Sequence, residues 1–337
     1  SIGRLFLLHS RDRCRTWSAY PVGLGYGRLE RRDGHTRLGG PPPLLVHDSG
    51  LRGILQLVVP KKRPDGTLDV SESKVISEDS YLVANHSGGG NSLVTVGNRI
   101  HVFFPGKTPI RGKERVGTPE YAVTYNRDDG TITKPVFLGF GGAGVPDAHN
   151  LPVVSADSQG YLHVVLGAHH DPFKYTRSKE PNSVTSGWTE PEMFGTPKRT
   201  PNEGSYTYVG LVCDAADTLH VVARWAGESY TFKLGYLRKP HGKPWEKNRN
   251  LVVPFKGNYH VWYHKLTIDR KDRLFLNYVC RAAIKRADEV PSFGKKWPVE
   301  KLSGRFLTQS HSLLTSSDHG DSWHLATSQD LGAKRDA

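Results

Sequence analysis

Histidine, tyrosine and arginine concentrate in four short segments of this chain, in places where ordinary strands need none of them. The side chains that we single out are His149, His169, Tyr208, Arg224 and Tyr263. His and Tyr transfer protons in many enzymes, and the planar guanidinium of Arg binds a carboxylate through two parallel hydrogen bonds. Arg224 directly follows the largely apolar run from Leu219 to Ala223, where a strand arginine needs an anionic partner or solvent.

These residue types suit one reaction in particular, β-elimination from a uronate. The reaction needs a cation to neutralise the carboxylate, a base to remove the C5 proton, and an acid to protonate the departing O4. Arginine suits the first role, and His and Tyr suit the other two. The five side chains include no pair of carboxylates, whereas a standard glycosidase needs two across the cleaved bond. A lone strand His or Tyr is more often a core or surface group, so the hypothesis rests on the combination.

The spacing of these residues predicts that they converge. Tyr208 and Tyr263 lie equally far before Leu219 and Leu274, which are anchor residues of an internal repeat. Equivalent positions in successive repeats face a common axis in a closed ring of sheets. His149, His169 and Arg224 lie at odd offsets from their own anchors, so on regular strands all five share one side-chain parity.

The composition predicts an all-β protein. Its 337 residues include 36 Gly, 22 Pro and many aromatics, and no long stretch has helical periodicity. All-β propellers of this length commonly form one domain, so we interpret residues 1–337 as a single unit.

A short pattern of a turn followed by alternating apolar residues recurs along the chain. The strong copies are Gly97–Phe103, Gly160–Val165, Asp217–Val222 and Asp272–Leu276, and weaker copies start at Gly3 and Gly53. A period of about 50 residues with several strands per unit is typical of propeller blades. The sequence therefore predicts a single β-propeller, with seven blades as the best count and six or eight as alternatives. We expect the N-terminal strand to close a blade with the C-terminal segment.

Two further segments resemble the Asp box, S-x-D-x-G-x-[ST]-W, of sialidase-like propellers. They are Ser10–Trp17 and Ser316–Trp323, and the first has Cys14 in the glycine position. In such a turn the Asp carboxylate accepts backbone N–H bonds, and glycine takes a positive φ. We assign both copies a structural role and expect Cys14 to distort the first turn.

The formal net charge of +13 favours polyanionic partners such as acidic glycans, although scattered solvated charge explains it equally well. We expect an anionic polysaccharide as substrate, no nucleic-acid partner and a monomer, because no nucleic-acid-binding motif accompanies the charge. No apolar run approaches the length of a membrane span, and three widely spaced cysteines form no disulfide framework. We expect a secreted or periplasmic protein.

The stretch from about Asn85 to Cys280 resembles the BNR-repeat propeller family that includes the ulvan lyases. Matching D-x-H-N, G-x-H-H, Y-T-Y, strand-Arg and W-Y-H segments occur in the same order. The resemblance implies that His149 and Tyr208 act as acid and base, in an order left open, and that Arg224 neutralises the uronate carboxylate. It implies that His169 and Tyr263 bind substrate near the cleaved bond.

No cofactor is required for this chemistry. Because related lyases carry a structural zinc ion, His260, His264 and Cys280 are candidate ligands, although their spacing forms no tight motif. Two other functions stay open. One is a sialidase-like glycoside hydrolase, although the usual Arg-Ile-Pro signature is absent. The other is a propeller that binds anionic glycan without catalysis.

Overall fold

The computed structural model describes most of the chain in segments separated by gaps. The segments are residues 3–33, 40–48, 52–81, 90–106, 110–111, 114–115, 117–142, 151–167, 169–195, 205–226, 232–253, 261–283 and 306–332. Strands are the only regular secondary structure in these segments, so the prediction of an all-β protein is confirmed. No helix within them is long and apolar enough to cross a membrane.

Six antiparallel sheets follow one another along the chain. The first three contain β1 (Arg4–His9) and β2 (Ser18–Leu24); β3 (Tyr26–Leu29), β4 (Leu44–His47), β5 (Arg52–Val58) and β8 (Ser73–Tyr81); and β9 (Leu93–Val96), β10 (Arg99–Pro105), β13 (Thr118–Asn126) and β14 (Val136–Gly141). The fourth contains β15 (Val153–Ala156), β16 (Leu162–Leu166), β18 (Phe173–Arg177) and β19 (Glu192–Phe194). The fifth contains β17 (His169–Asp171), β20 (Ser205–Cys213), β21 (Leu219–Ala226), β22 (Phe232–Lys239) and β23 (Arg249–Val252). The sixth contains β24 (Val261–Ile268), β25 (Leu274–Ala283), β26 (Phe306–Ser316) and β27 (His324–Leu325). Two short hairpins lie outside these sheets, β6 (Lys61–Lys62) with β7 (Leu68–Asp69) and β11 (Ile110–Arg111) with β12 (Glu114–Arg115).

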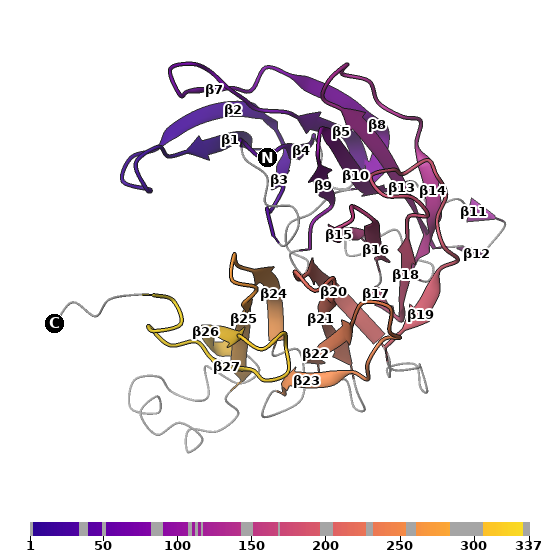
Figure 1. The fold of residues 1–337 in the computed structure, drawn as a ribbon, viewed down its shortest axis with the longest axis vertical. Helices are drawn as coiled ribbons and strands as arrows, with labels where there is room; N and C mark the ends of the chain where they lie inside the picture. The colour runs from indigo at the N-terminus through magenta and orange to yellow at the C-terminus, as the bar shows by residue number, and fades with distance from the viewer. Residues whose placement is uncertain are drawn as a thin grey trace.

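The six sheets are arranged around a common centre as the blades of a β-propeller (Figure 1). From the third sheet onward strands β9, β15, β20 and β24 contact one another in turn. The four strong copies of the sequence repeat form β10, β16, β21 and β25, and each of these pairs with one of those four strands. The six described sheets fit within the seven-bladed ring that the sequence predicts.

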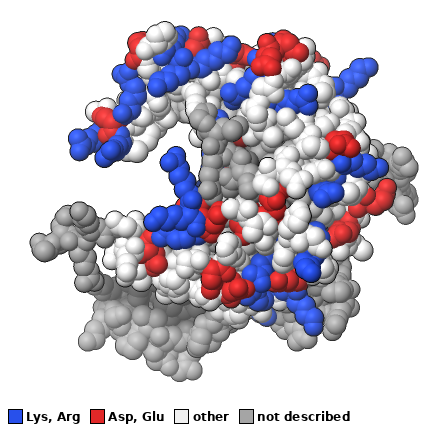
Figure 2. Space-filling model, in the orientation of Figure 1, with Lys and Arg blue, Asp and Glu red and all other residues white. Residues whose placement is uncertain are grey.

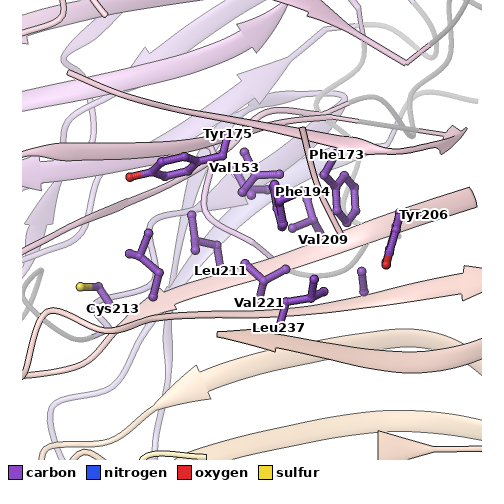
Figure 3. Packing of buried hydrophobic residues seen from close by; sticks show 13 residues of the cluster. Val153, Phe173, Tyr175, Phe194, Tyr206, Val209, Leu211, Cys213, Val221 and Leu237 are labelled. Atoms are coloured by element: carbon purple, nitrogen blue, oxygen red, sulfur yellow. The ribbon is translucent and has the colours of Figure 1, made fainter. Parts of the chain in front are cut away.

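Each pair of neighbouring sheets is held together by its own apolar core. The core between the fourth and fifth sheets combines Val153, Phe173 and Phe194 with Val209 and Leu211 (Figure 3). Corresponding clusters lie at the other junctions of consecutive sheets. Because the alternating apolar residues of both sheets meet there, burial of these faces is the main force that stacks one blade on the next.

One tryptophan at each of the last three junctions completes these cores in a repeated way. Trp188, Trp245 and Trp323 each meet a ring of the preceding sheet edge to face. The partners are Phe103, Tyr175 and Tyr236, with ring centroids 6.0, 5.4 and 5.4 Å apart, respectively. The third, fourth, fifth and sixth sheets are therefore true structural repeats.

The predicted pairing of the N-terminal strand with the C-terminal segment is wrong for the described residues. Strand β1 pairs with β2 in a separate sheet, and β27 pairs with β26 at the edge of the sixth sheet. The first and sixth sheets border an opening in the arc (Figure 1). Near the centre, Arg31 connects the beginning and the end of the arc, because its Nη1 donates to the carbonyl oxygen of Leu266 at 2.9 Å.

The two turns around Asp12 and Asp318 have matching hydrogen bonds. The backbone N–H of Cys14 and that of Gly320 donate to the serine that begins each turn, at 2.8 and 2.9 Å. The hydrogen bonds from Thr16 lower the pKa of Asp12 to about 2. Cys14 adopts a φ of 66°, close to the 83° of Gly320, so the expected distortion is absent.

Lys and Arg side chains are distributed over several blades with Asp and Glu between them on the face shown in Figure 2. This face has no single basic stripe.

Candidate active site

Tyr208 and Tyr263 occupy equivalent, strained positions in consecutive blades. Tyr208 has a φ of 63° in β20, and Tyr263 has a φ of 44° in β24. The register of each strand with its neighbour shifts at this point, between Thr207 and Gly210 and between Trp262 and Lys265. A positive φ is unfavourable for a bulky side chain, and such strain persists chiefly where function requires it. The two bulges aim the phenol rings toward each other, with centroids 6.1 Å apart.

Arg224 is a fully buried arginine held between two aromatic rings. Its backbone pairs with Thr207 of β20 on one side and with Leu234 of β22 on the other. Its Cζ lies 4.4 Å from the ring centroid of Tyr208 and 4.4 Å from that of Phe232. The ring faces attract the cation and orient its planar guanidinium. The structure therefore brings Tyr208, Arg224 and Tyr263 into one cluster.

The connections of the blades place Tyr208, Arg224, Tyr263 and the backbone of His169 toward the same end of the ring. Tyr208 and Tyr263 lie near the start of β20 and β24, and Arg224 lies near the end of β21. The backbone of His169, in β17, pairs with Thr207 of β20. The side chain of His169 lies outside the described residues, as does all of His149. Whether these two histidines approach Arg224 therefore stays a prediction.

His264 lies directly after Tyr263 and points into the junction between the fifth and sixth sheets. Its Nε2 donates to the carbonyl oxygen of Val222 at 3.0 Å. Burial lowers the pKa of His264 to about 4, and the positive charge of Arg224 adds to this effect. The imidazole is therefore neutral near pH 7, and it fixes the bulged strand against β21.

Glu120 is a buried carboxyl group that sequence reasoning missed. Its Oε1 accepts a hydrogen bond from the backbone N–H of Gly167 at 2.9 Å. Burial raises the pKa of Glu120 well above its usual range. Gly167 stands two residues before His169 in the chain, so Glu120 anchors the start of the segment that carries this histidine.

Phe232 was missed for a different reason. A single phenylalanine at the start of an apolar strand is indistinguishable from a core residue in the sequence. Its contact with Arg224 depends on the register between β21 and β22, which sequence patterning does not determine.

The described residues give no support to a zinc site. No group of three or more His, Cys, Asp or Glu within them could hold a metal ion. His260 lies outside these residues, and the Nε2 of His264 already donates to Val222. The zinc hypothesis stays a prediction, and no chemical step below depends on a metal.

Comparison with known proteins adds a family assignment. The profile described as "BNR repeat-containing family member" matches residues 114–335. Among solved structures, an ulvan lyase of a new polysaccharide lyase family is 15% identical over 71% of this chain and 55% of its own, with a TM-score of 0.48. A second polysaccharide lyase is 13% identical over 75% of this chain and 58% of its own, with a TM-score of 0.46. An α-L-arabinanase from Penicillium chrysogenum is 14% identical over 81% and 80%, with a TM-score of 0.44.

This chain thus spans little more than half the length of the two lyases. Among curated protein sequences, none matches it.

Proposed function

This chain belongs to the BNR repeat-containing family, and from that premise we propose that it is a polysaccharide lyase. Its substrate in this proposal is a uronate-containing, sulfated and ulvan-like polysaccharide, which it cleaves by β-elimination. The broader activity, a propeller enzyme that acts on glycans, agrees with the ulvan lyase and the arabinanase among structures of similar arrangement.

The observation that carries the proposal is the position of Arg224 against Tyr208. A guanidinium that lies 4.4 Å from a phenol ring, in a fully buried position, is preorganised to meet a carboxylate and a proton-transfer group together. The strained bulge at Tyr208 is the local feature that brings the ring onto Arg224.

The elimination balances in three movements. A base removes the C5 proton of the uronate, and the electron pair left behind delocalises into the carboxylate, where Arg224 stabilises the added charge. The C4–O4 bond then breaks as a C4–C5 double bond forms. An acid gives a proton to O4 of the departing sugar, and the other product is a 4,5-unsaturated uronate.

We assign the two proton transfers to His149 and Tyr208 and leave their order open, since it depends on the configuration of the uronate at C5. The guanidinium of Arg224 lies over the ring of Tyr208, so in this proposal charge neutralisation and the proton transfer by Tyr208 take place close together. Tyr263, with its ring 6.1 Å from that of Tyr208, and His169 are assigned to substrate binding. A polymeric substrate of this kind also implies a secreted or periplasmic location.

The proposal is tested with four uronate polymers: ulvan, heparan sulfate, alginate and pectate. Product formation is followed by the ultraviolet absorbance of the new conjugated double bond, which hydrolysis does not generate. We expect activity on ulvan. Replacement Arg224→Lys retains the charge and loses the planar fork, so kcat should fall by roughly 100-fold or more.

The matched control is Arg249→Lys. Arg249 also lies over a tyrosine ring, 4.9 Å from the centroid of Tyr236, but at the other end of the fifth sheet. Its replacement should leave kcat within about twofold. Failure of the wild-type protein to produce the chromophore from any of the four polymers, with retained binding, would favour a non-catalytic glycan-binding protein. Release of saturated sugars would favour a hydrolase.

A further inference from the structure

The end of the fifth–sixth junction that lies away from Arg224 is filled by a network of polar side chains. His220 donates from Nε2 to Asp214 at 3.0 Å, and its Nδ1 accepts from the hydroxyl of Tyr236 at 2.6 Å. The turn between β26 and β27 then contributes His319, whose Nδ1 lies 2.9 Å from the same oxygen of Asp214. A side chain from the following blade thus covers the network.

An arginine beside this network has its charge balanced by carboxylates. Arg238 makes an ion pair of 3.0 Å with Glu246 and another of 2.6 Å with Asp321. The neighbouring Gly320 packs so closely on Tyr236 that a Cβ atom there would overlap the tyrosine oxygen. Among the described residues, the Arg238 end of this network is thus closely packed.

The fourth–fifth junction repeats the network but not its cover. His163 donates to Asp157 at 3.1 Å and accepts from Tyr175 at 2.7 Å, as in the next blade. Beside this network the structure has a cavity of about 160 Å³ that opens to solvent. It is lined by Asp157, His163, Tyr175, Arg177, Asp217, Leu219, Lys239, Pro240, His241 and Gly242. That volume holds several water molecules or one small oxyanion.

Arg177 is the counterpart of Arg238, since both stand two residues after the tyrosine of the network. Its Cζ lies 4.6 Å from the ring centroid of Tyr161. Among the described residues, no carboxylate lies within ion-pairing distance of Arg177 or Lys239, whereas Arg238 has two. A guanidinium carries five N–H donors in a fork that matches a carboxylate or a sulfate.

The acidic residues of the cavity wall are already engaged. Asp157 accepts hydrogen bonds from His163 and from the backbone of Tyr161, and Asp217 accepts two from Ser158 at 2.7 Å each. Burial alone would raise the pKa of Asp157, but the hydrogen bond and charge of His163 outweigh it and lower this pKa. The wall carboxylates are therefore bound to the protein. Lys239 donates one of its three ammonium N–H bonds to the carbonyl oxygen of Lys243 at 2.6 Å, so Lys239 and Arg177 can both donate to an incoming anion.

We propose that this cavity is a second glycan-binding site, in which Arg177 and Lys239 hold a carboxylate or sulfate group of an acidic sugar. The bound group would take the place that the Glu246 and Asp321 carboxylates occupy around Arg238. In the next blade, two carboxylates neutralise the equivalent arginine, Arg238.

The cavity lies at the opposite end of the junction from the candidate active site. Figure 3 shows Tyr175 and Cys213 at one end of the shared core and Tyr206, the neighbour of Thr207, at the other. A polymer held at this site therefore does not block elimination at Arg224. The proposal is independent of the lyase chemistry and requires only that the ligand is an acidic glycan.

The test is calorimetric titration with two probes, sodium sulfate and a sulfated, uronate-containing tetrasaccharide. We expect two bound tetrasaccharides per chain, one at each site, and one in Arg177→Gln. Sulfate affinity should fall at least about tenfold in this variant, because a charge-assisted bond is lost. If the Arg224 site binds no acidic glycan while this cavity does, the wild type binds one tetrasaccharide and Arg177→Gln binds none. A failure of catalysis alone leaves both stoichiometries unchanged.

A second variant tests the same site without removing a basic residue. Gly242 has a φ of 68°, which Asp tolerates better than most residues, and a Cβ there would have open space around it. Gly242→Asp should introduce a carboxylate into the cavity and exclude the anion, again with at least a tenfold loss of affinity. Arg270→Gln, which removes an exposed arginine, is the control and should bind as the wild type does.

Unchanged stoichiometry and affinity in both Arg177→Gln and Gly242→Asp would overturn the proposal. Binding of sulfate without binding of the tetrasaccharide would overturn it too, because the ligand would then be a free anion. Thermal unfolding of each variant shows that a loss of binding is not a loss of folded protein.

Discussion

Buried polar groups at the two ends of the fifth sheet have different kinds of partners. At one end, Arg224 is stacked between aromatic rings, and the ring on one side belongs to Tyr208, whose backbone is strained. At the other end, both ring nitrogens of His220 are hydrogen-bonded, to Asp214 and Tyr236. Both ends are fully buried, so burial alone does not distinguish a candidate active site from a structural network.

The two ends differ in the partners that surround His220 and Arg224. Burial lowers the pKa of His220, and its two partners fix a neutral imidazole with one donor and one acceptor. Such a satisfied network stabilises the fold and has no spare capacity for a ligand. At the other end the backbone of Tyr208 is strained and Arg224 is stacked between aromatic rings, and strain of this kind is typical of functional sites rather than of structural networks. Substitutions at the two ends should therefore affect different measurements.

The largest expected effect is on catalysis, in Tyr208→Phe. Loss of the phenol hydroxyl removes one of the two proposed proton-transfer groups, so kcat on ulvan should fall by roughly 10²- to 10⁴-fold. The ring that stacks on Arg224 remains, so the free energy of unfolding should change by less than about 1 kcal/mol. Steady-state kinetics and urea unfolding check the two halves of this prediction.

Tyr206→Phe is the matched control for it. Tyr206 lies two residues earlier in the same strand and is fully buried, but its ring packs against Phe173, with centroids 5.1 Å apart. We expect kcat within about twofold of wild type. Equal losses of activity in the two variants would show that the strand, and not the Tyr208 hydroxyl, is responsible.

At the other end, His220→Ala should have the opposite outcome. It leaves the Asp214 carboxylate with one imidazole partner fewer and opens a cavity in the core. The free energy of unfolding should fall by about 3 kcal/mol. Activity per folded molecule should stay unchanged, as measured at a temperature well below the unfolding midpoint. A loss of kcat in fully folded His220→Ala would break the separation of the two ends.

The sequence predicted the end that carries the candidate site better than the structural end. Tyr208 and Tyr263 were recognisable because each lies the same number of residues before its repeat anchor, Leu219 or Leu274. Residues at the same distance from the anchor occupy equivalent places in successive blades. Asp214 and His220 were not recognised, although Asp157 and His163 have the same six-residue separation. That repeated spacing is the signal that could have revealed the network.

Other features depend on contacts that no local pattern encodes. Strand β1 pairs with β2 because the hairpin between them closes early, while closure with the C-terminal segment would have required pairing across the whole chain. Glu120 looks like an ordinary polar residue of an alternating strand, and only the approach of Gly167 from the next sheet buries it. The periodicity of the sequence predicts the blades, but which side chains are buried between two blades also depends on the loops.

Glu120 is a third buried polar group, and burial disfavours the charged form of its carboxyl group. Because the pKa of Glu120 is raised on folding, the folded protein holds a proton at pH values where the unfolded chain has released it. The contribution of Glu120 to the free energy of unfolding is therefore fully present below the usual glutamate pKa. It is lost as the pH rises through the pKa of the folded state. Glu120→Gln keeps a neutral side chain at every pH. It should therefore unfold at a higher temperature than the wild type at pH 8, and the difference should shrink toward pH 4.

Thermal unfolding of both proteins across this pH range measures the effect, and the difference in unfolding temperature should be larger at pH 8 than at pH 4. A constant difference between pH 4 and pH 8 would show that the carboxyl group does not titrate as burial requires. Gln retains the acceptor for the Gly167 N–H, so a uniform loss of stability is not expected.

The smallest effect concerns backbone strain at a structural turn. Cys14 is exposed and holds a φ of 66° that glycine adopts freely, whereas the strain at Tyr208 belongs to the candidate site. Cys14→Gly should relieve about 1 kcal/mol of conformational strain, and roughly half of this gain should be offset by the larger chain entropy of glycine in the unfolded state. We expect the free energy of unfolding, measured with urea, to rise by about 0.5 kcal/mol and kcat to stay unchanged.

The equivalent turn gives the contrast, since Gly320→Ala should be clearly destabilising because its new Cβ meets Tyr236. Relief of strain without a functional cost at Cys14 would confirm that only the strain near Arg224 is tied to activity, and a fall in kcat would contradict it.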